Sequence, residues 1–433
     1  MTSLKLLVKN ARQAVLVCNS KELFLRGEAM KRVLVLEQDG ANGVSVVVGR
    51  DGCISAVGHT ASIEKQFHDA TFDKVIDAQG MCVMPGLIDG HTHPVWAGDR
   101  VHEFAMKLAG ASYMEVHKAG GGIYFTVEHT QKASEEELYQ LFKSRLERMM
   151  HAGTTTVECK SGYGLDLETE IKMLRVLTRA SKELPFIEIS STYCGAHAIP
   201  KGKSSEEATD DVIKNQLPRI QQLVKNGELQ VDNIDVFCEK GVYDVDQSRR
   251  ILQAGKDIGL AINFHAEELN LLNGAEMGAE LEARAMSHLE EISDAGIEAM
   301  AKANSVAVIL PTTAYILRLK SPPVRKMIDA GVPVALGTDF NPNAFCMSMS
   351  LIMHLACVNM RMSMEEALVA STINAAASIG KAATHGSLEV GKVADLLIIN
   401  APRWEHLVYQ MGGHDHLIKY VIKKGDIVHS SNC

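Results

Sequence analysis

From Met84 onward the chain alternates short apolar runs with longer amphipathic stretches. The short runs have the length and β-branched content of buried strands, and the longer stretches repeat apolar residues at helical spacing. Helices are expected at Ser134–His151, Leu167–Glu183, Gln247–Ile258 and Ser293–Asn304. The eight expected strands are Leu87–Asp89, Thr154–Cys159, Ile187–Cys194, Asn233–Cys238, Ala261–Phe264, Ala285–Ser287, Val306–Leu310 and Val332–Leu336.

This alternation predicts the fold class. Each helix returns the chain to the starting edge of the sheet, so that successive strands run parallel. Eight such repeats are typical of the α/β class with a closed (β/α)8 TIM-like barrel. A doubly wound open sheet is the alternative that the same pattern allows.

Both ends of the chain are instead rich in short β-type runs. Asp51-Gly52 separates two of them and predicts a hairpin turn, because both residues tolerate positive φ. We expect the two ends to pair into one small β-sandwich domain, with residues 1–83 and 384–433 flanking a barrel at 84–383. The runs are Leu4–Val8, Ala14–Val17, Val33–Leu36, Val44–Val48, Ile54–Val57, Leu396–Ile399 and Tyr420–Ile422.

Composition restricts the partners and the compartment. The 433 residues are 46% hydrophobic and 22% charged, as in a well-packed globular enzyme, and the net charge of −9 comes without a long basic run. This argues against nucleic acid but still allows a small anionic substrate. No apolar run reaches the roughly 18 residues that span a bilayer, and no signal-peptide pattern is present. The nine scattered cysteines form no CxxC pair, which favours reduced thiols in the cytoplasm.

One segment at the first barrel strand is dense in polar side chains. It reads Pro85-Gly-Leu-Ile-Asp-Gly-His91-Thr-His93. Residues two apart on an extended chain point to the same side, so His91 and His93 can face one metal ion. Solvated loop histidines are the ordinary explanation of such a pair. Its place at the carboxyl end of a strand, where barrels build active sites, favours metal ligation.

Further histidines and acids follow four other expected strands; they are His197, His265, Glu268, His288 and Asp339. Each alone is explained by a core hydrogen bond or a helix cap. Together they would converge above the barrel axis, where burial without a metal or substrate costs several kcal/mol. A mononuclear site needs three or four ligands and an open position for water. His91, His93, one further histidine and Asp339 supply these ligands, and the Asp339 carboxylate can also accept the proton of the water.

The same segments resemble the amidohydrolase superfamily. The likeness lies in the Pro85–His93 segment, in His265, His288 and Gly-Thr-Asp339, and in Gly386–Leu396, which is similar to the segment that returns such chains to the small β domain. Other stretches resemble one branch of that superfamily, and the resemblance covers essentially the whole chain. They are His93-Pro-Val-Trp-Ala-Gly-Asp-Arg100, Glu158–Glu170, Tyr193-Cys-Gly-Ala-His197 and Thr338-Asp-Phe-Asn341-Pro.

The resemblance implies a metal-dependent hydrolase that opens an amide-type C–N bond in a five-membered ring bearing an anionic tail. It implies a homodimer with one divalent or trivalent metal ion per subunit, zinc or iron. The implied metal ligands are His91, His93, His265 and Asp339. Of the implied catalytic residues, Asp339 takes the proton of the attacking water, Glu268 protonates the ring nitrogen and His288 stabilises the oxyanion.

The resemblance also implies the residues of the substrate pocket. Among them, Arg100 suits the anionic tail because a guanidinium matches a carboxylate in a two-pronged pair. The implied substrate-binding residues are Arg100, Tyr113, Tyr163, His197, Glu268 and Asn341. Many bacterial members of the branch read Phe-Asn-Pro-Gly-Ser where this chain has Phe340-Asn-Pro-Asn-Ala344. A serine contact at the last position cannot be made here, so the resemblance assigns no role to Ala344 and leaves the role of Asn343 open.

Three alternative interpretations apply to this chain. Lys160 follows a strand and is similar to the carboxylated lysine that bridges two metals in some relatives, but it follows the second strand rather than the fourth. A purine or pyrimidine deaminase would share the metal ligands and differ in the pocket. A non-catalytic scaffold of the same fold would typically lack metal ligands, which this chain retains. His414 and His416 form another HxH pattern, but no strand precedes them and we expect both at the surface.

Overall fold

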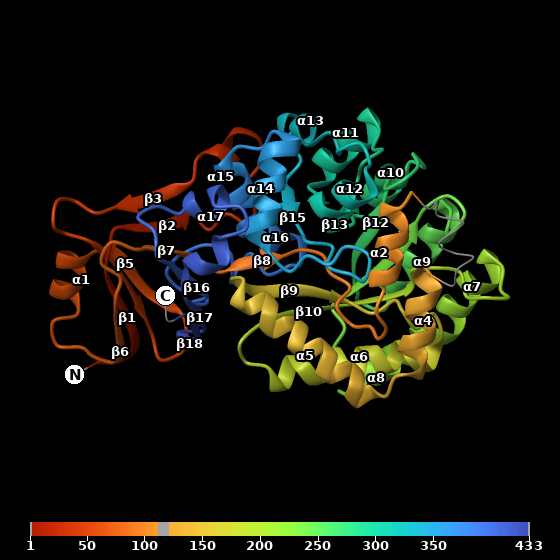
Figure 1. Ribbon diagram of the computed structural model, residues 1–433, viewed down its shortest axis with the longest axis horizontal. Coiled ribbons are helices and arrows are strands. Elements are labelled where there is room, and N and C mark those ends of the chain that lie inside the picture. Colours follow the sequence, from red (N-terminus) through yellow and green to blue (C-terminus); the bar gives the residue numbers. More distant parts are fainter. Residues whose placement is uncertain (1, 111–120, 432–433) are drawn as a thin grey trace.

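The computed structural model describes residues 2–110 and 121–431, and its central element is a sheet of eight parallel strands (Figure 1). The strands are neighbours in strict sequence order, which confirms the barrel prediction; a doubly wound sheet would reorder them. They are β8 Leu87–Asp89, β9 Thr154–Lys160, β10 Glu188–Ala196, β11 Asn233–Cys238, β12 Ala261–Ala266, β13 Ala285–His288, β14 Val306–Ile309 and β15 Val334–Leu336.

The barrel closes beyond the ends of its first and last strands. Gly90 N–H donates to the Leu336 carbonyl at 3.3 Å, and Asp339 N–H donates to the His91 carbonyl at 3.0 Å. The Asp89 carboxylate joins the same two strands, accepting from Thr338 N–H at 2.9 Å and from the Thr338 hydroxyl at 2.6 Å. Closure therefore places the first HxH segment beside Asp339.

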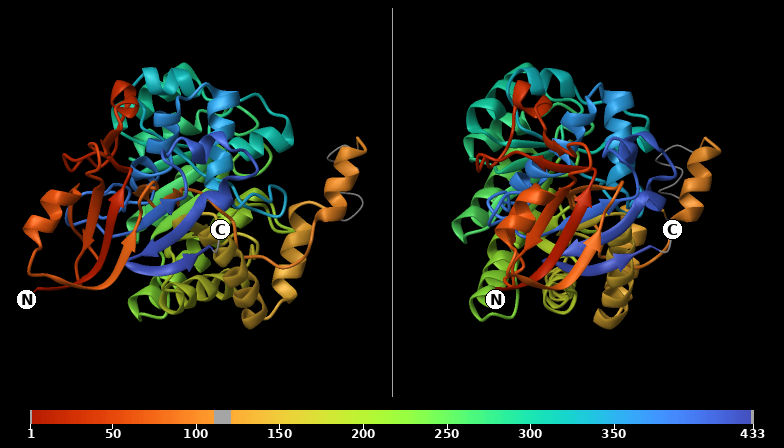
Figure 2. Two further views of the ribbon diagram at one scale, coloured as in Figure 1. Left: turned by 60° about the vertical axis from the view of Figure 1, so that its left-hand side comes forward. Right: turned by 90° about the vertical axis from the view of Figure 1, so that its left-hand side faces the viewer.

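Helices cover the outside of the barrel, and polar caps fix where several of them begin. Ser134 accepts from Glu137 N–H at the start of α5, and Asp166 accepts from Thr169 N–H at the start of α6. The outer helices are α4 Ile123–Lys132, α5 Glu135–His151, α6 Leu167–Glu183, α7 Ser205–Asp211, α8 Leu217–Lys225, α9 Val245–Asp257, α10 Gly274–Glu280, α11 Asp294–Ala303, α12 Pro311–Leu317, α13 Val324–Asp329, α14 Met349–Met360, α15 Met364–Ala370 and α16 Ile373–Ser378. Helix α2 (Val101–Leu108) projects from the barrel near its mouth (Figure 2).

The two ends of the chain build a second, smaller β domain beside the barrel (Figure 1). One sheet has the order β5-β4-β1-β6 and the other β18-β17-β16-β7-β2-β3, so the second sheet mixes strands from both ends. Apolar residues of both sheets share one core, in which Val8 and Ile398 are fully buried. The strands are β1 Ser3–Ala11, β2 Gln13–Val17, β3 Leu34–Glu37, β4 Val44–Val48, β5 Ile54–His59, β6 Thr71–Asp77, β7 Cys82–Pro85, β16 Leu396–Ile399, β17 Ile418–Lys423 and β18 Asp426–Ser430.

Most expected elements are present, with several additions and one correction. The Asp51-Gly52 turn joins β4 and β5 as an antiparallel hairpin, with Gly52 at φ +79°. Strand β7 crosses residue 83, where the first β-rich segment was expected to end. The expectation that His414 lies at the surface is wrong: it is buried, and its Nε2 lies 2.6 Å from the Ser348 hydroxyl. Within the described ranges, no helix is both long enough and apolar enough to span a membrane.

Candidate metal centre and substrate pocket

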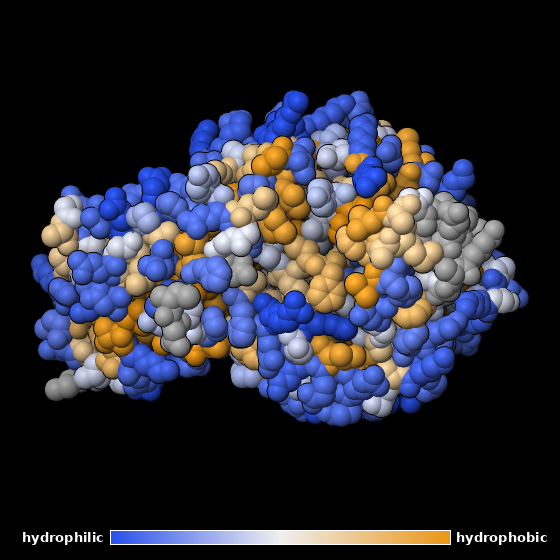
Figure 3. Space-filling model, in the orientation of Figure 1, coloured by the Kyte–Doolittle hydropathy of each residue, from blue (hydrophilic) through white to orange (hydrophobic). Residues whose placement is uncertain are grey.

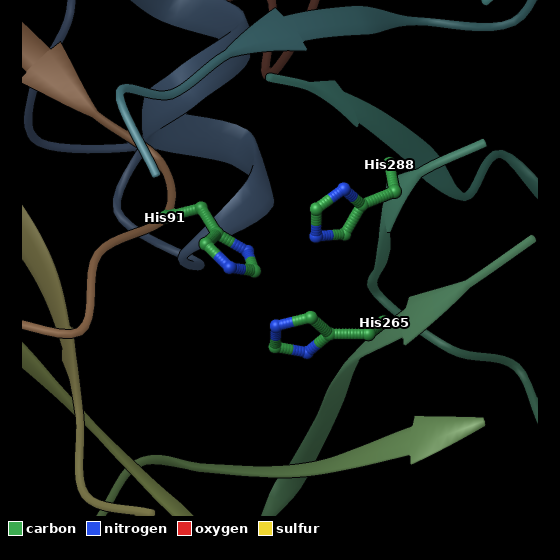
Figure 4. A group of neighbouring side chains, drawn as sticks. All are labelled: His91, His265 and His288. Atoms are coloured by element: carbon green, nitrogen blue, oxygen red, sulfur yellow. The ribbon is translucent and has the colours of Figure 1, made fainter. Parts of the chain in front are cut away.

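Three imidazoles and one carboxylate meet at the carboxyl end of the barrel. His93 Nε2 lies 3.2 Å from both His91 Nε2 and His265 Nε2. Asp339 Oδ1 lies 3.5 Å from His91 Nε2 and 3.6 Å from His93 Nε2. Figure 4 shows the rings of His91, His265 and His288 turned toward a common centre. The three imidazoles of His91, His93 and His265 and the carboxylate of Asp339 are almost fully buried.

The chemistry of this donor set fits a metal ion. Asp339 Oδ2 accepts a hydrogen bond from the Thr313 hydroxyl, whereas Oδ1 has no hydrogen-bond partner among the described residues and faces the imidazoles. Ligand atoms bonded at about 2.0–2.1 Å around a tetrahedral zinc ion lie roughly 3.3–3.4 Å apart. The observed separations of 3.2–3.6 Å bracket that value. Asp339 adopts φ +48°, a backbone conformation uncommon for a non-glycine residue and frequent at functional sites.

The histidines are held in the neutral form that metal ligation requires. Burial lowers the pKa of His91, His93 and His265, and for His265 it outweighs the neighbouring Asp235. Asp235 Oδ1 lies 2.8 Å from His265 Nδ1. Because a carboxylate only accepts, Nδ1 carries the proton and Nε2 turns its lone pair to the centre. Ser287 lies 2.8 Å from His91 Nδ1 and orients that ring.

Lys160 pairs with two buried carboxylates in this structure. Its amine is therefore not in the position of a carboxylated lysine that bridges two metals. Its ammonium is fully buried, 2.8 Å from Glu158 Oε1 and 2.7 Å from Asp235 Oδ2. Burial opposes the charged form, but the two carboxylates outweigh it and raise the pKa of Lys160. In turn, burial alone would raise the pKa of Asp235, but His265 and Lys160 lower it to about 2. Lys160 thus balances the carboxylate that orients His265.

Beside the imidazole cluster, His288 lies between two buried carboxylates. Glu268 Oε2 is 3.6 Å from His288 Nε2, and Glu290 Oε2 is 3.7 Å from Nδ1. Burial opposes a charged ring, yet the two carboxylates raise the pKa of His288 to about 10. Burial raises the pKa of Glu268 to about 7, against the opposing effect of His288. The arrangement holds an acid with a pKa near neutrality next to a protonated imidazole.

The opposite side of the cluster carries His197 and Tyr163. The His197 ring stacks on His93 with centroids 4.7 Å apart, and its Nδ1 lies 3.0 Å from the Gly162 carbonyl. The carbonyl only accepts, so Nδ1 is the donor. The Tyr163 ring is buried 5.3 Å from His197 and 6.0 Å from His93. Both residues therefore lie next to the candidate metal ligands.

Two of the remaining expected substrate-binding residues, Arg100 and Asn341, are hydrogen-bonded to other parts of the protein. Arg100 makes a two-pronged pair with buried Glu103, at 2.7 and 2.6 Å. The Asn341 side chain is used within its own loop: Nδ2 donates to the Asp339 carbonyl at 2.7 Å, and Oδ1 accepts from Asn343 N–H at 2.7 Å. Tyr113 lies outside the described residues.

Other groupings of the same side chains are geometrically possible. Ligand atoms of His91, His265 and His288 lie within 4.8 Å of one another, and so do those of His93, His197 and His265. Reasoning from the sequence did not single out Asp235, Ser287 or Glu290 as parts of this site. Asp235 gave a signal, since it is an acid between the apolar residues Ile234 and Val236 of an expected strand. Ser287 and Glu290 gave none, because they flank a histidine without any distinctive pattern.

Comparison with known proteins agrees with the fold and the site. Residues 82–428 match the Amidohydrolase family. The chain is 64% identical over 426 residues to a human protein named "Probable imidazolonepropionase", covering 98% of this chain and 99% of that protein. It is 66% identical over 430 residues to a Danio rerio protein of the same name, covering 99% and 98%. The chain belongs to the amidohydrolase family, whose members typically use a metal, and it is a hydrolase acting on C–N bonds.

Solved structures with much lower sequence identity share the fold. An adenosine deaminase from Xanthomonas campestris with bound zinc superposes with a TM-score of 0.73 at 17% identity, covering 98% of this chain and 93% of that one. The guanine deaminase of E. coli gives a TM-score of 0.70 at 16% identity, with both chains fully covered. At these identities the likeness supports the barrel and the small β domain and says nothing about the substrate.

Proposed function

We propose that the chain has imidazolonepropionase activity, the activity for which its relatives of about 64% identity are named. The reaction adds water to 4-imidazolone-5-propanoate and yields N-formimidoyl-L-glutamate. The oxygen of water bonds to the ring carbonyl carbon, the bond from that carbon to the ring nitrogen breaks, and the nitrogen takes a proton. The observation that carries the proposal is the convergence of three neutral imidazoles and a carboxylate beside the Glu268–His288 pair.

The metal is one zinc or iron ion per subunit, held by His91, His93, His265 and Asp339. Nitrogen and carboxylate oxygen ligands suit both metals, so the donor set alone does not choose between them. When bound, such an ion lowers the pKa of a water molecule toward neutrality and polarises a carbonyl group.

The chain's own residues move the protons and stabilise charge. Asp339 Oδ1, which has no hydrogen-bond partner among the described residues, accepts the proton of the attacking water. Glu268, with a pKa near 7, can hold a proton at neutral pH and deliver it to the departing ring nitrogen. The protonated His288 ring donates toward the developing oxyanion.

The anionic tail of the substrate is proposed to bind opposite the metal. Arg100 is the anchor, and Tyr163, His197 and Tyr113 line the pocket. Asn341 contributes through the loop that it closes behind Asp339. We further propose that the protein acts in the cytoplasm as a homodimer and that neither nucleic acid nor a membrane is a partner.

The direct test uses freshly generated substrate. The purified protein is mixed with urocanase and urocanate, and N-formimidoyl-glutamate is measured by mass spectrometry. Product that forms only in the presence of this protein supports the proposal. The same preparation is incubated with adenosine, guanine and cytosine while ammonia is measured. Ammonia release without N-formimidoyl-glutamate would make the protein a deaminase instead.

A further inference from the structure

The loop between β9 and α6 reaches the substrate pocket, yet its conformation is set by a residue outside the pocket. Residues Ser161 to Leu165 are all buried. The loop carries the Tyr163 side chain, and its Gly162 carbonyl accepts the His197 Nδ1–H at 3.0 Å. One short segment therefore fixes two of the proposed substrate-binding side chains.

Glu170, on the first turns of α6, closes this loop. Its Oε2 accepts from Gly162 N–H at 3.0 Å, and its Oε1 accepts from Gly164 N–H at 2.8 Å and from Leu165 N–H at 2.9 Å. The Ser161 hydroxyl also donates to it. Glu170 is fully buried, so these donors take the place of water around its carboxylate. A carboxylate with several backbone donors binds a loop more firmly than neutral partners would.

Two glycines allow the loop to approach so closely. A Cβ on Gly164 would lie 2.8 Å from Glu170 Oε1 and 2.7 Å from the Glu170 backbone nitrogen. Gly162 adopts φ +109°, and a Cβ there would lie 2.9 Å from the Cys194 carbonyl oxygen and 3.2 Å from His197 Nδ1. The loop is thus packed between the carboxylate on one side and the His197 ring on the other.

We propose that Glu170 is a positioning residue for substrate binding: by closing the Ser161–Leu165 loop, it sets where Tyr163 and His197 meet the substrate. The inference rests on the proposed function, because Tyr163 and His197 are substrate-binding only under that proposal. Glu170 binds backbone groups behind the pocket and takes no part in proton transfer. Its loss therefore weakens binding of the ground state and the transition state alike, which raises KM and leaves kcat nearly unchanged.

The test compares Glu170→Gln with Glu366→Gln. Glutamine has an NH2 group in place of one carboxylate oxygen, and this group cannot accept from the Gly162 N–H. That hydrogen bond is lost while the shape of the side chain is kept. Glu366 is also fully buried and accepts from Ser363 N–H at 2.8 Å, but it caps α15 away from the pocket. Glu170→Gln is expected to raise KM about tenfold or more, with kcat within about threefold of the wild type. Glu366→Gln is expected to leave both constants unchanged.

Two further measurements separate positioning from general destabilisation. In hydrogen exchange, the Gly162, Gly164 and Leu165 amides should exchange faster in Glu170→Gln and not in Glu366→Gln. In the double variant Glu170→Gln/Tyr163→Phe, the rise in KM should be smaller than the product of the rises in the two single variants. The shortfall should be a factor of about 3 or more, because both changes act on the same contact with the substrate. Gly164→Ala displaces the loop while keeping the Glu170 carboxylate, and it should raise KM in the same way. It provides the test in case the Glu170→Gln protein does not fold.

The outcomes distinguish this inference from the proposed function. If the wild type turns over the imidazolone substrate and Tyr163→Phe raises KM, but Glu170→Gln and Gly164→Ala match Glu366→Gln, the positioning role of Glu170 is refuted. If the wild type does not act on this substrate at all, the proposed function is refuted, and the role assigned to Glu170 in substrate binding is refuted with it.

Discussion

His93 and His288 lie in one cluster of imidazoles, but their surroundings differ. His93 Nε2 faces two neutral rings and Asp339, whereas His288 lies between two carboxylates that raise its pKa to about 10. A protonated ring has no lone pair for a cation. We therefore predict that His93→Ala abolishes bound metal and activity together, while His288→Ala retains its metal. Elemental mass spectrometry measures the metal content of the two purified variants, and a turnover assay measures their activity. Metal loss in His288→Ala would place His288 among the ligands.

Glu268 provides the second residue-scale prediction. If it delivers a proton, Glu268→Gln keeps its shape but loses the acid, and kcat should fall by roughly 10²–10⁴ with metal content unchanged. Glu291→Gln is the matched control, because that exposed side chain lies on the next strand-end loop. A Glu268→Gln enzyme within about threefold of wild type, far short of that range, would refute the proton-transfer role.

At the scale of elements, Arg100, the proposed anchor for the substrate tail, lies immediately before α2. Arg100 is already paired there with Glu103, so its guanidinium is oriented before substrate arrives. We predict that Arg100→Ala raises KM by the equivalent of about 1.5–3 kcal/mol, the worth of a charge-assisted pair, with little change in kcat. Steady-state kinetics measure this, with the exposed Arg175→Ala on α6 as control. A large fall in kcat at unchanged KM would instead assign Arg100 to the chemical step.

The barrel strands and main outer helices could be predicted from the sequence because periodicity and caps are local signals. Helix α6 was predicted at its observed bounds, and every barrel strand within a few residues. Strand β18 was missed although its partner β17 directly precedes it, because its residues are only partly buried or exposed. Strands β6 and β7 were missed since their pairing partners lie far away in the chain. His414 was misplaced for the same reason: its burial depends on Ser348, 66 residues earlier.

The candidate site shows a similar division. The HxH segment, His265 and Asp339 could be expected to converge because strand ends of a barrel share one face. The partners that tune them could not, because a buried acid such as Asp235 acquires its role only when folding places it against His265 and Lys160. Glu290 lies only two residues after His288, but its pairing with that ring depends on the local backbone path after β13 and leaves no pattern in the sequence.

At the scale of the whole molecule, the surface in Figure 3 is mostly hydrophilic, with several groups of apolar residues on the small β domain and on the barrel. Exposed apolar side chains on the barrel include Phe104 of α2 and Tyr315 of α12. Such a distribution is compatible with association of subunits. The homodimer stays a prediction, which light scattering coupled to size-exclusion chromatography measures directly.

The contact between the barrel and the small domain includes a partly buried ionic cluster. Glu188 opens β10 of the barrel, and its carboxylate lies 3.0 Å from Lys381 Nζ, 4.0 Å from Lys423 Nζ and 3.4 Å from Lys424 Nζ. The two latter lysines belong to the end of β17 and the turn after it, in the small domain. Burial would raise the pKa of Glu188, but the three lysines lower it to about 2.

A depressed pKa in the folded state means that ionised Glu188 stabilises the folded protein above its unfolded pKa. This contribution is complete above about pH 4.5 and is lost as the pH falls toward about 2. Glu188→Gln should therefore lower the free energy of unfolding at pH 7 by about 1–3 kcal/mol, after allowance for partial solvent exposure. Glu298→Gln, exposed on α11, is the control. Denaturant titrations at several pH values should show the difference between Glu188→Gln and wild type shrinking as the pH falls from 4.5 toward 2. A difference that is constant across this range would show that the carboxylate charge does not hold the two domains together.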